Sequence, residues 1–125
     1  MVKGIGIDLV SESEMKRLLD ILSPGALARM FSASELAEAD RREGRAMYLA
    51  ERLAVKEAAF KAISPVKGGI GFDLRIIETL NRPDGSPYIA RGGEIETVLA
   101  EAEASQVLVS ITTEAGLAQA VVLCE

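Results

Sequence analysis

A long helix that carries a compact block of charges constrains this sequence more than any other feature. The segment from Arg45 to Ile63 contains neither proline nor glycine, follows Gly44 and ends before Ser64-Pro65, so it predicts one helix of about five turns. Its middle part, RLAVKEAAFK at residues 52–61, combines one carboxylate with an arginine and two lysines. A helix of this length needs a sheet or other helices to cover its apolar side.

The segments before and after this helix supply such a partner. Apolar, β-branched runs predict strands at residues 2–10, 74–80, 88–90, 106–113 and 117–123, the last two joined as a hairpin. Shorter helices are predicted after a cap at Ser11 or Ser13, at residues 26–31, at residues 32–40 with a capping box, and at residues 94–104. This order favours an α+β fold in one domain, residues 1–125, with an antiparallel sheet packed against the long central helix.

Composition restricts the class of protein. Apolar residues make up 49% of the chain but aromatic residues only 4%, so the predicted core is aliphatic. The net charge of −5 and the lack of a basic patch predict no nucleic-acid partner. No segment approaches the roughly 20 apolar residues of a membrane span, and no signal peptide is visible. With Cys124 as the only cysteine, these features predict a cytoplasmic protein without a membrane partner.

The chain contains no histidine, which removes several kinds of chemistry at once. Nucleophilic sites of the Ser-His and Cys-His type and histidine metal sites are excluded. Any reaction must therefore use carboxylates, lysines, hydroxyl groups or metal-bound water.

Asp8, in the first predicted strand, and the central helix together supply the groups that a phosphoryl-type transfer needs. Asp8 and Glu57 offer two carboxylates for a divalent metal, and Lys61 with its basic neighbours offers cations for phosphate oxygens. A structural alternative is that Glu57 and Lys61 form an i,i+4 ion pair worth about 0.3–0.5 kcal/mol, while Asp8 is a solvated strand residue.

Several distinct short motifs follow one another along the chain. They are Gly4-Ile5-Gly6-Ile7-Asp8-Leu9-Val10, Phe31 with Ser34-Glu35-Leu36, Tyr48-Leu49-Ala50, the block from Arg52 to Ala58, Lys61-Ala62, Asp84-Gly85-Ser86-Pro87-Tyr88 and Val109-Ser110-Ile111-Thr112. In this order and spacing the sequence closely resembles the holo-acyl-carrier-protein synthase family, the small trimeric type of 4′-phosphopantetheinyl transferase. The resemblance covers nearly the whole chain and implies the fold of that family.

The resemblance implies a transfer reaction. The 4′-phosphopantetheine group of coenzyme A would move to a serine of an apo acyl carrier protein and release 3′,5′-ADP, and the protein would be a homotrimer with its active sites at the subunit interfaces. The family's Mg²⁺ ligands match Asp8 and Glu57, and these two residues with Lys61 would be catalytic. Carboxylate oxygens suit this hard cation.

The same resemblance implies a coenzyme-binding surface. Its residues would be Arg52, Lys56, Lys61, Gly68, Gly69 and Thr113. Gly68 and Gly69 lie in a glycine-rich loop at residues 67–71, and their alternative role is that of ordinary turn glycines.

The sequence also departs from the family. Thr113 stands where the family usually has a histidine near the coenzyme phosphates, and Lys67 is the nearest cation in sequence that would compensate. Glu51 replaces a glycine, and its carboxylate either faces solvent or repels phosphate. The first helix, which is typically basic in the family for docking acidic carrier proteins, is close to neutral here.

These departures leave two alternatives to the transferase. The first alternative is a divergent, non-catalytic homologue that acts as a binding or assembly protein. The second is a metal-dependent phosphohydrolase of another type. Retention of Asp8, Glu57 and Lys61 favours the transferase.

Overall fold

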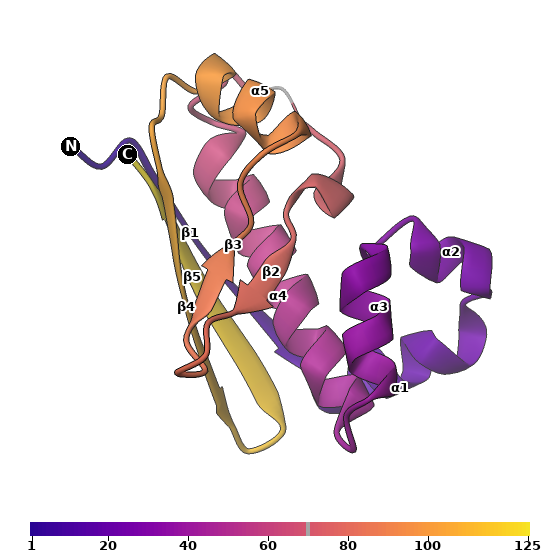
Figure 1. The fold of residues 1–125 in the computed structure, drawn as a ribbon. Helices are drawn as coiled ribbons and strands as arrows, with labels where there is room; N and C mark the ends of the chain where they lie inside the picture. The colour runs from indigo at the N-terminus through magenta and orange to yellow at the C-terminus, as the bar shows by residue number, and fades with distance from the viewer. Residues whose placement is uncertain (70) are drawn as a thin grey trace.

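A three-stranded antiparallel sheet packed against one long helix forms the centre of the structure (Figure 1). The computed structural model describes residues 1–69 and 71–125. The sheet has the strand order β1 (Gly4–Ser11), β5 (Leu117–Cys124), β4 (Val107–Glu114), and β2 (Thr79–Asn81) pairs separately with β3 (Pro87–Ile89). The helices are α1 (Glu12–Ile21), α2 (Pro24–Ala28), α3 (Ala33–Asp40), α4 (Arg45–Ile63) and α5 (Glu94–Glu101). The predicted α+β class is confirmed.

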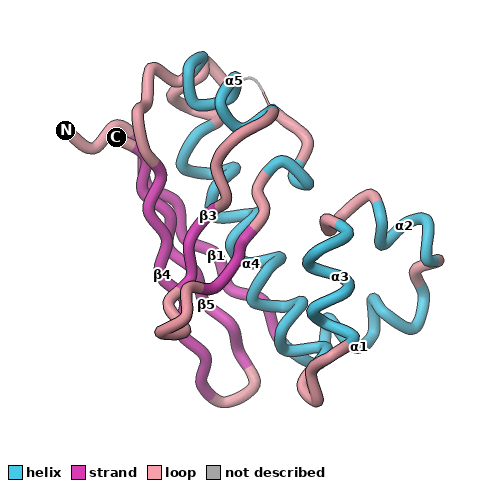
Figure 2. Tube along the Cα trace, in the orientation of Figure 1, coloured by secondary structure: helices cyan, strands magenta, loops and turns pink. Residues whose placement is uncertain are grey.

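The helices lie on one side of the three-stranded sheet (Figure 2). Helix α4 runs along the sheet, with α1 and α3 packed near its N-terminal half and α5 near its C-terminal end (Figure 1). The strand pattern explains this layering, because Ala118, Ala120 and Val122 of β5 are buried while residues of β1 on the opposite face are exposed. In the described part of the chain, no helix combines the length and apolar character needed to cross a bilayer.

Two glycines of β1 allow the strand to lie unusually close to α4. A Cβ atom at Gly4 would lie 1.9 Å from the carbonyl oxygen of Ala62, and one at Gly6 would lie 1.9 Å from that of Ala58. Real Cβ atoms do not approach backbone so closely, so these positions exclude every larger residue at this separation. The alanines on the facing side of α4 complete a contact made almost entirely of backbone.

The structure corrects the predicted strand at residues 74–80. Leu74–Ile76 form a 3₁₀ turn, capped by Asp73, whose side chain accepts a hydrogen bond from the backbone N–H of Arg75, and only Thr79–Asn81 form a strand. The backbone carbonyls of Leu74 and Ile77 accept hydrogen bonds from the ammonium group of Lys56 rather than from a neighbouring strand. A tertiary interaction with a distant residue therefore overrides the local β propensity.

Pro24 also differs from expectation. The run Ser23-Pro24-Gly25 is typical of a helix stop, and α1 does end before it. Pro24 is, however, the first residue of α2, where its missing N–H costs nothing, and the Ser23 side chain caps that helix. The strand predicted at residues 2–10 is observed as β1, Gly4–Ser11, and the side chain of Ser11 caps α1.

We predict that Gly6→Ala destabilises the protein by roughly 3 kcal/mol or more, because the new methyl group must separate β1 from α4. Gly25→Ala is the matched control: the site lies in α2 and has no close neighbour, so this substitution should be neutral or slightly stabilising. Urea unfolding measures both free energies. Equal effects for the two variants would contradict the close contact.

Candidate functional site

Asp8 reaches the side of α4 because of the alternation in β1. Residues 4, 6, 8 and 10 face the helix, and β1 is an edge strand of its sheet. The ammonium group of Lys61 lies 3.0 Å from Oδ1 of Asp8 and donates a second hydrogen bond of 3.1 Å to the backbone carbonyl of Ile7. The Lys61 side chain is 54% exposed and that of Asp8 18%, so this pair lies open to solvent at the sheet edge.

Glu57 lies one helical turn before Lys61 and is partly buried. Burial raises the pKa of its carboxyl group, the negative charge of Asp8 raises it further, and Lys61 opposes both effects. The three side chains expected to act together therefore influence one another across the junction of β1 and α4. The ion pair of Lys61 is formed with Asp8 rather than with Glu57, unlike the i,i+4 pair considered above.

A shallow depression adjoins this group of side chains. Its lining residues are Ile7, Asp8, Leu9, Lys61 and Gln119. Two carboxylates and an ammonium group next to an open depression offer ligands for a divalent cation and a contact for an anionic group. No cluster of three or more metal-ligating side chains exists among the described residues, so water or substrate oxygens would have to complete any such coordination.

Lys56 was expected on a basic coenzyme-binding surface, but the structure places it in the interior. Its side chain is fully buried, with Nζ 2.8 Å from Oε1 of Glu35 and 2.5 Å from the carbonyl oxygen of Ile77. Glu35, also fully buried, accepts further hydrogen bonds from the backbone N–H groups of Ser32 and Thr79. Burial lowers the pKa of Lys56 and Glu35 counteracts this. This pair joins α3, α4 and β2.

Arg52 is also buried rather than exposed. One guanidinium nitrogen, Nη2, donates a 2.6 Å hydrogen bond to Oδ1 of Asn81, and its Cζ lies 4.3 Å from the centre of the Tyr48 ring. Its Nε and Nη1 are buried without a hydrogen-bond partner within residues 1–69 and 71–125. Since buried N–H groups of a cation are costly to leave unpaired, Arg52 remains a candidate for binding an anion.

The glycine-rich loop has the features of a turn. Gly68 and Gly69 have φ angles of 77° and 86°, a region that favours glycine, and the N–H of Gly69 donates to the carbonyl of Ser64 after α4. Residue 70 of the predicted loop lies outside the described residues. Lys67, suggested as a compensating cation, is largely buried and forms a 2.7 Å ion pair with Glu101.

Thr113 lies near the far end of β4 and is exposed. In the sheet, Thr113 of β4 pairs with Ala118 of β5, and Ala118 pairs with Val10 of β1. Thr113 therefore lies two strands from β1, and its row of paired residues is two residues further along the sheet than the row that contains Asp8. Strand spacings of about 4.8 Å and rises of about 3.3 Å per residue separate the Cα atoms of Thr113 and Asp8 by about 12 Å. The structure therefore does not bring Thr113 into contact with Asp8 within one chain.

Sequence analysis did not identify two residues that complete these interactions. The predicted capping box that contains Glu35 is confirmed, but the buried pair of Glu35 with Lys56 had no local signal. Asn81 carries no functional signal in the sequence either, because its contact with Arg52 spans 29 positions. A charged residue at a predicted core position of α4 is the one sign that such a distant partner exists.

The sequence and the fold match one known family. The profile of the 4′-phosphopantetheinyl transferase superfamily matches residues 4–122. The chain belongs to this superfamily. A holo-[acyl-carrier-protein] synthase of Anaeromyxobacter sp. strain K is 35% identical over 130 residues, covering all of this chain and 97% of the relative.

Solved structures agree with this assignment. The holo-[acyl-carrier-protein] synthase of Neisseria meningitidis superimposes with a TM-score of 0.87 and 30% identity, over 100% of this chain and 99% of the other. The coenzyme A complex of the Chronobacterium ammoniagenes enzyme has a TM-score of 0.79 and 29% identity, over 97% and 95% of the two chains. The resemblance stated from the motifs is thus confirmed, and the chain is a member of the holo-acyl-carrier-protein synthases.

We predict that Lys56→Met lowers the free energy of unfolding by about 3–5 kcal/mol, because it leaves the buried charge of Glu35 unpaired. A double variant, Lys56→Met with Glu35→Gln, should recover part of this loss. Arg75→Met removes one partner of an exposed pair with Asp73 and should leave the unfolding midpoint unchanged. A Lys56 variant as stable as the Arg75 variant would contradict the buried pair. Chemical denaturation provides the comparison.

Proposed function

We propose that the protein transfers the 4′-phosphopantetheine group of coenzyme A to a serine of an apo acyl carrier protein, in a Mg²⁺-dependent reaction that releases 3′,5′-ADP. The observation that carries this proposal is the convergence of Asp8, Glu57 and Lys61 at the open edge of β1, in the fold of a transferase superfamily. The serine Oγ forms a bond to the β-phosphorus, and the bond from that phosphorus to the leaving 3′,5′-ADP oxygen breaks. The serine proton passes to water or to a carboxylate of the site.

The chemistry of the donor set supports Mg²⁺. Asp8 and Glu57 come from different elements and present carboxylate oxygens, and the charge of Asp8 already disfavours the ionised form of Glu57. A dication held by both carboxylates would relieve this repulsion. When bound, Mg²⁺ withdraws charge from the phosphate under attack and stabilises the leaving phosphate.

The remaining residues would orient the donor. Lys61 is exposed and can exchange its pair with Asp8 for a phosphate oxygen, so we assign it to the pyrophosphate. Arg52, with two unpartnered N–H groups, is assigned to a second anionic group of the coenzyme. Lys56 supports the site from within the core, and Gly68 and Gly69 form the turn that follows α4. Thr113 would contribute a neutral hydroxyl group.

A non-catalytic binding role is the second candidate, and the charges of α1 favour it. Lys16 and Arg17 pair with Glu12 and Glu14 on the same helix, which leaves little positive potential for an acidic carrier protein. In that case the protein would bind coenzyme A without transfer.

We predict that an apo carrier protein from the same source gains one phosphopantetheine when incubated with the protein, coenzyme A and Mg²⁺. Glu57→Gln and Asp8→Asn should each reduce the rate by about 100-fold or more, because each removes a proposed metal ligand. Glu94→Gln, an exposed carboxylate outside this group, should retain the rate. EDTA should abolish transfer and excess Mg²⁺ restore it. Mass spectrometry follows the product; binding of coenzyme A with no transfer would instead support the second candidate.

We also propose that the protein is a homotrimer with active sites between subunits. The face of the three-stranded sheet opposite α4 exposes a group of large apolar side chains, namely Ile5, Ile7, Leu9, Leu108 and Leu117. Exposed apolar side chains gathered on one face mark an interaction surface. A partner chain on this face would adjoin the depression beside Asp8, because Ile7 and Leu9 line that depression.

Light scattering should accordingly give three times the chain mass of 13.3 kDa. Ile7→Glu should dissociate the trimer, because it places a charge in the apolar contact. Ile21→Glu alters another exposed apolar residue, which lies on α1 outside this sheet face, and should leave the mass unchanged. A wild-type mass of one chain at micromolar concentration would refute the trimer.

A further inference from the structure

The depression beside Asp8 continues past the edge of the sheet. Two residues that line it, Leu9 and Gln119, also line a second depression, which lies on the exposed face of the three-stranded sheet. The second depression extends along this face to Thr112 and Leu117. Because the two depressions share two lining residues, they adjoin as one groove, which we call the sheet-face groove and which begins at the candidate site.

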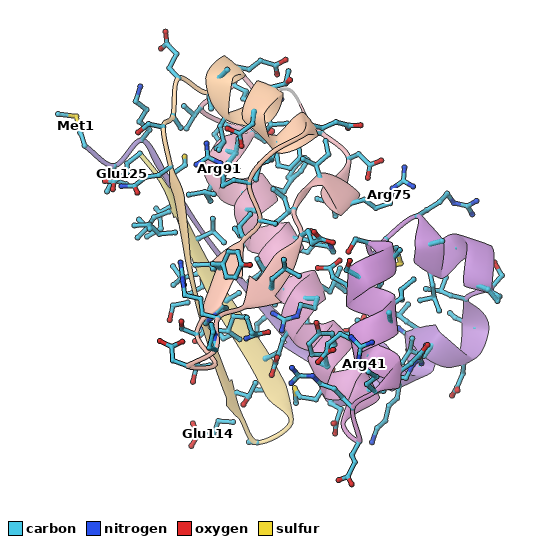
Figure 3. All side chains as sticks on the ribbon, viewed as in Figure 1. Met1, Arg41, Arg75, Arg91, Glu114 and Glu125 are labelled. Carbon is cyan, nitrogen blue, oxygen red and sulfur yellow. The ribbon has the colours of Figure 1, made fainter. Side chains whose placement is uncertain are left out.

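The strand register explains why these side chains gather on one face. Leu9 of β1 pairs with Gln119 of β5, which pairs with Thr112 of β4, so the three form one row across the sheet. Leu117 and Glu114 pair in the next row on the same face, and Glu114 lies near the tip of the β4–β5 hairpin (Figure 3). All five residues are exposed, whereas the residues between them on β5 are buried. The groove therefore runs from the edge of β1 toward the hairpin tip.

The sheet-face groove combines apolar walls with two neutral polar groups. Leu9 and Leu117 supply the apolar surface, while Gln119 presents an amide and Thr112 a hydroxyl group. Within residues 1–69 and 71–125, neither polar side chain is hydrogen-bonded to another protein group. No cation is found among the described residues that line the second depression, where Glu114 is the one charged residue. This part of the groove suits an elongated, uncharged ligand that carries amide groups, and not a phosphate.

Coenzyme A has one part with this chemistry, its pantetheine arm. In the reaction proposed above, the pyrophosphate lies at Asp8 and Lys61, and the arm extends from the phosphate under attack. The arm carries a hydroxyl group, two methyl groups and two amides. When extended, it spans about 14 Å, and its first amide lies about 6 Å from the phosphorus. Strand geometry places the Cα of Gln119 about 6 Å and that of Leu117 about 11 Å from the Cα of Asp8, so the groove and the arm agree in length.

We propose that the sheet-face groove binds the pantetheine arm of the donor, and that Gln119 positions the arm by hydrogen bonding to one of its amides, with Thr112 as a second polar contact. This inference rests on the proposed function. The serine attacks the phosphorus to which the arm is attached, so a groove that holds the arm also orients that phosphorus. In the trimer proposed above, a partner chain on this face would close the open side of the groove.

The test measures dissociation constants by calorimetry in the presence of Mg²⁺, for coenzyme A and for 3′,5′-ADP, which lacks the arm. Gln119→Met keeps the length of the side chain but removes its amide, so it should weaken binding of coenzyme A by about three- to tenfold and that of 3′,5′-ADP by less than about twofold. Thr112→Val should show a smaller loss with the same selectivity.

The chain's other glutamine provides the matched control. The side chain of Gln106 lies just before β4, at the end far from Thr112, and donates a hydrogen bond to the carboxylate of Glu125. Gln106→Met makes the same chemical change outside the groove and should alter neither dissociation constant.

Equal losses for both ligands, or unchanged affinity for coenzyme A in both groove variants, would overturn the proposal. A higher KM for the carrier protein in the Gln119 variant, with unchanged affinity for coenzyme A, would also overturn it and would assign the groove to the acceptor. If the wild type transfers phosphopantetheine in any of these cases, the inference fails and the proposed function stands. If the wild type binds neither ligand and transfers nothing, both fail.

Discussion

The close contact of β1 with α4 determines where every charged group of the site lies. Gly4 and Gly6 remove the side chains that would hold the strand away from Ala58 and Ala62. The next residue on the same side of β1 is Asp8, which consequently reaches Lys61 and affects the pKa of Glu57. A strand at ordinary distance, with side chains between it and the helix, would leave these groups apart. The two glycines thus allow the backbones of β1 and α4 to pack together, and this packing brings Asp8 to the charged residues of α4.

The charges of α4 serve two different purposes according to the direction in which they point. Lys56 and Arg52 face inward, where Glu35 and Asn81 bind them and connect α4 to α3 and β2. Lys61 faces the edge of β1, where it remains exposed. Because Lys56 is held entirely by buried partners, it helps to fix the helix on which Glu57 and Lys61 are carried. The outward charges remain free to exchange partners with a substrate.

The sequence predicted the elements and the motif better than the environment of each charge. The ends of α4 follow from Gly44 and Ser64-Pro65, and the spacing of Gly4 and Gly6 in the sequence matches the two positions at which β1 approaches α4 most closely. Whether Lys56 lies inside or outside depends on Glu35, which is 21 residues away and belongs to a different helix. No local periodicity reports such a pairing. The 3₁₀ turn at Leu74–Ile76 was missed for the same reason, since Lys56 takes carbonyl groups of that segment.

We infer that the approach of β1 to α4 creates a shared site for a divalent cation and the donor's phosphates. Crystals grown with coenzyme A and Mn²⁺, a substitute for Mg²⁺ with a strong anomalous signal, test it directly. The account predicts one anomalous peak bound by carboxylate oxygens of both Asp8 and Glu57, with Lys61 turned from Asp8 toward a phosphate. A donor bound elsewhere, or a peak that contacts neither carboxylate while Lys61 still pairs with Asp8, would contradict it.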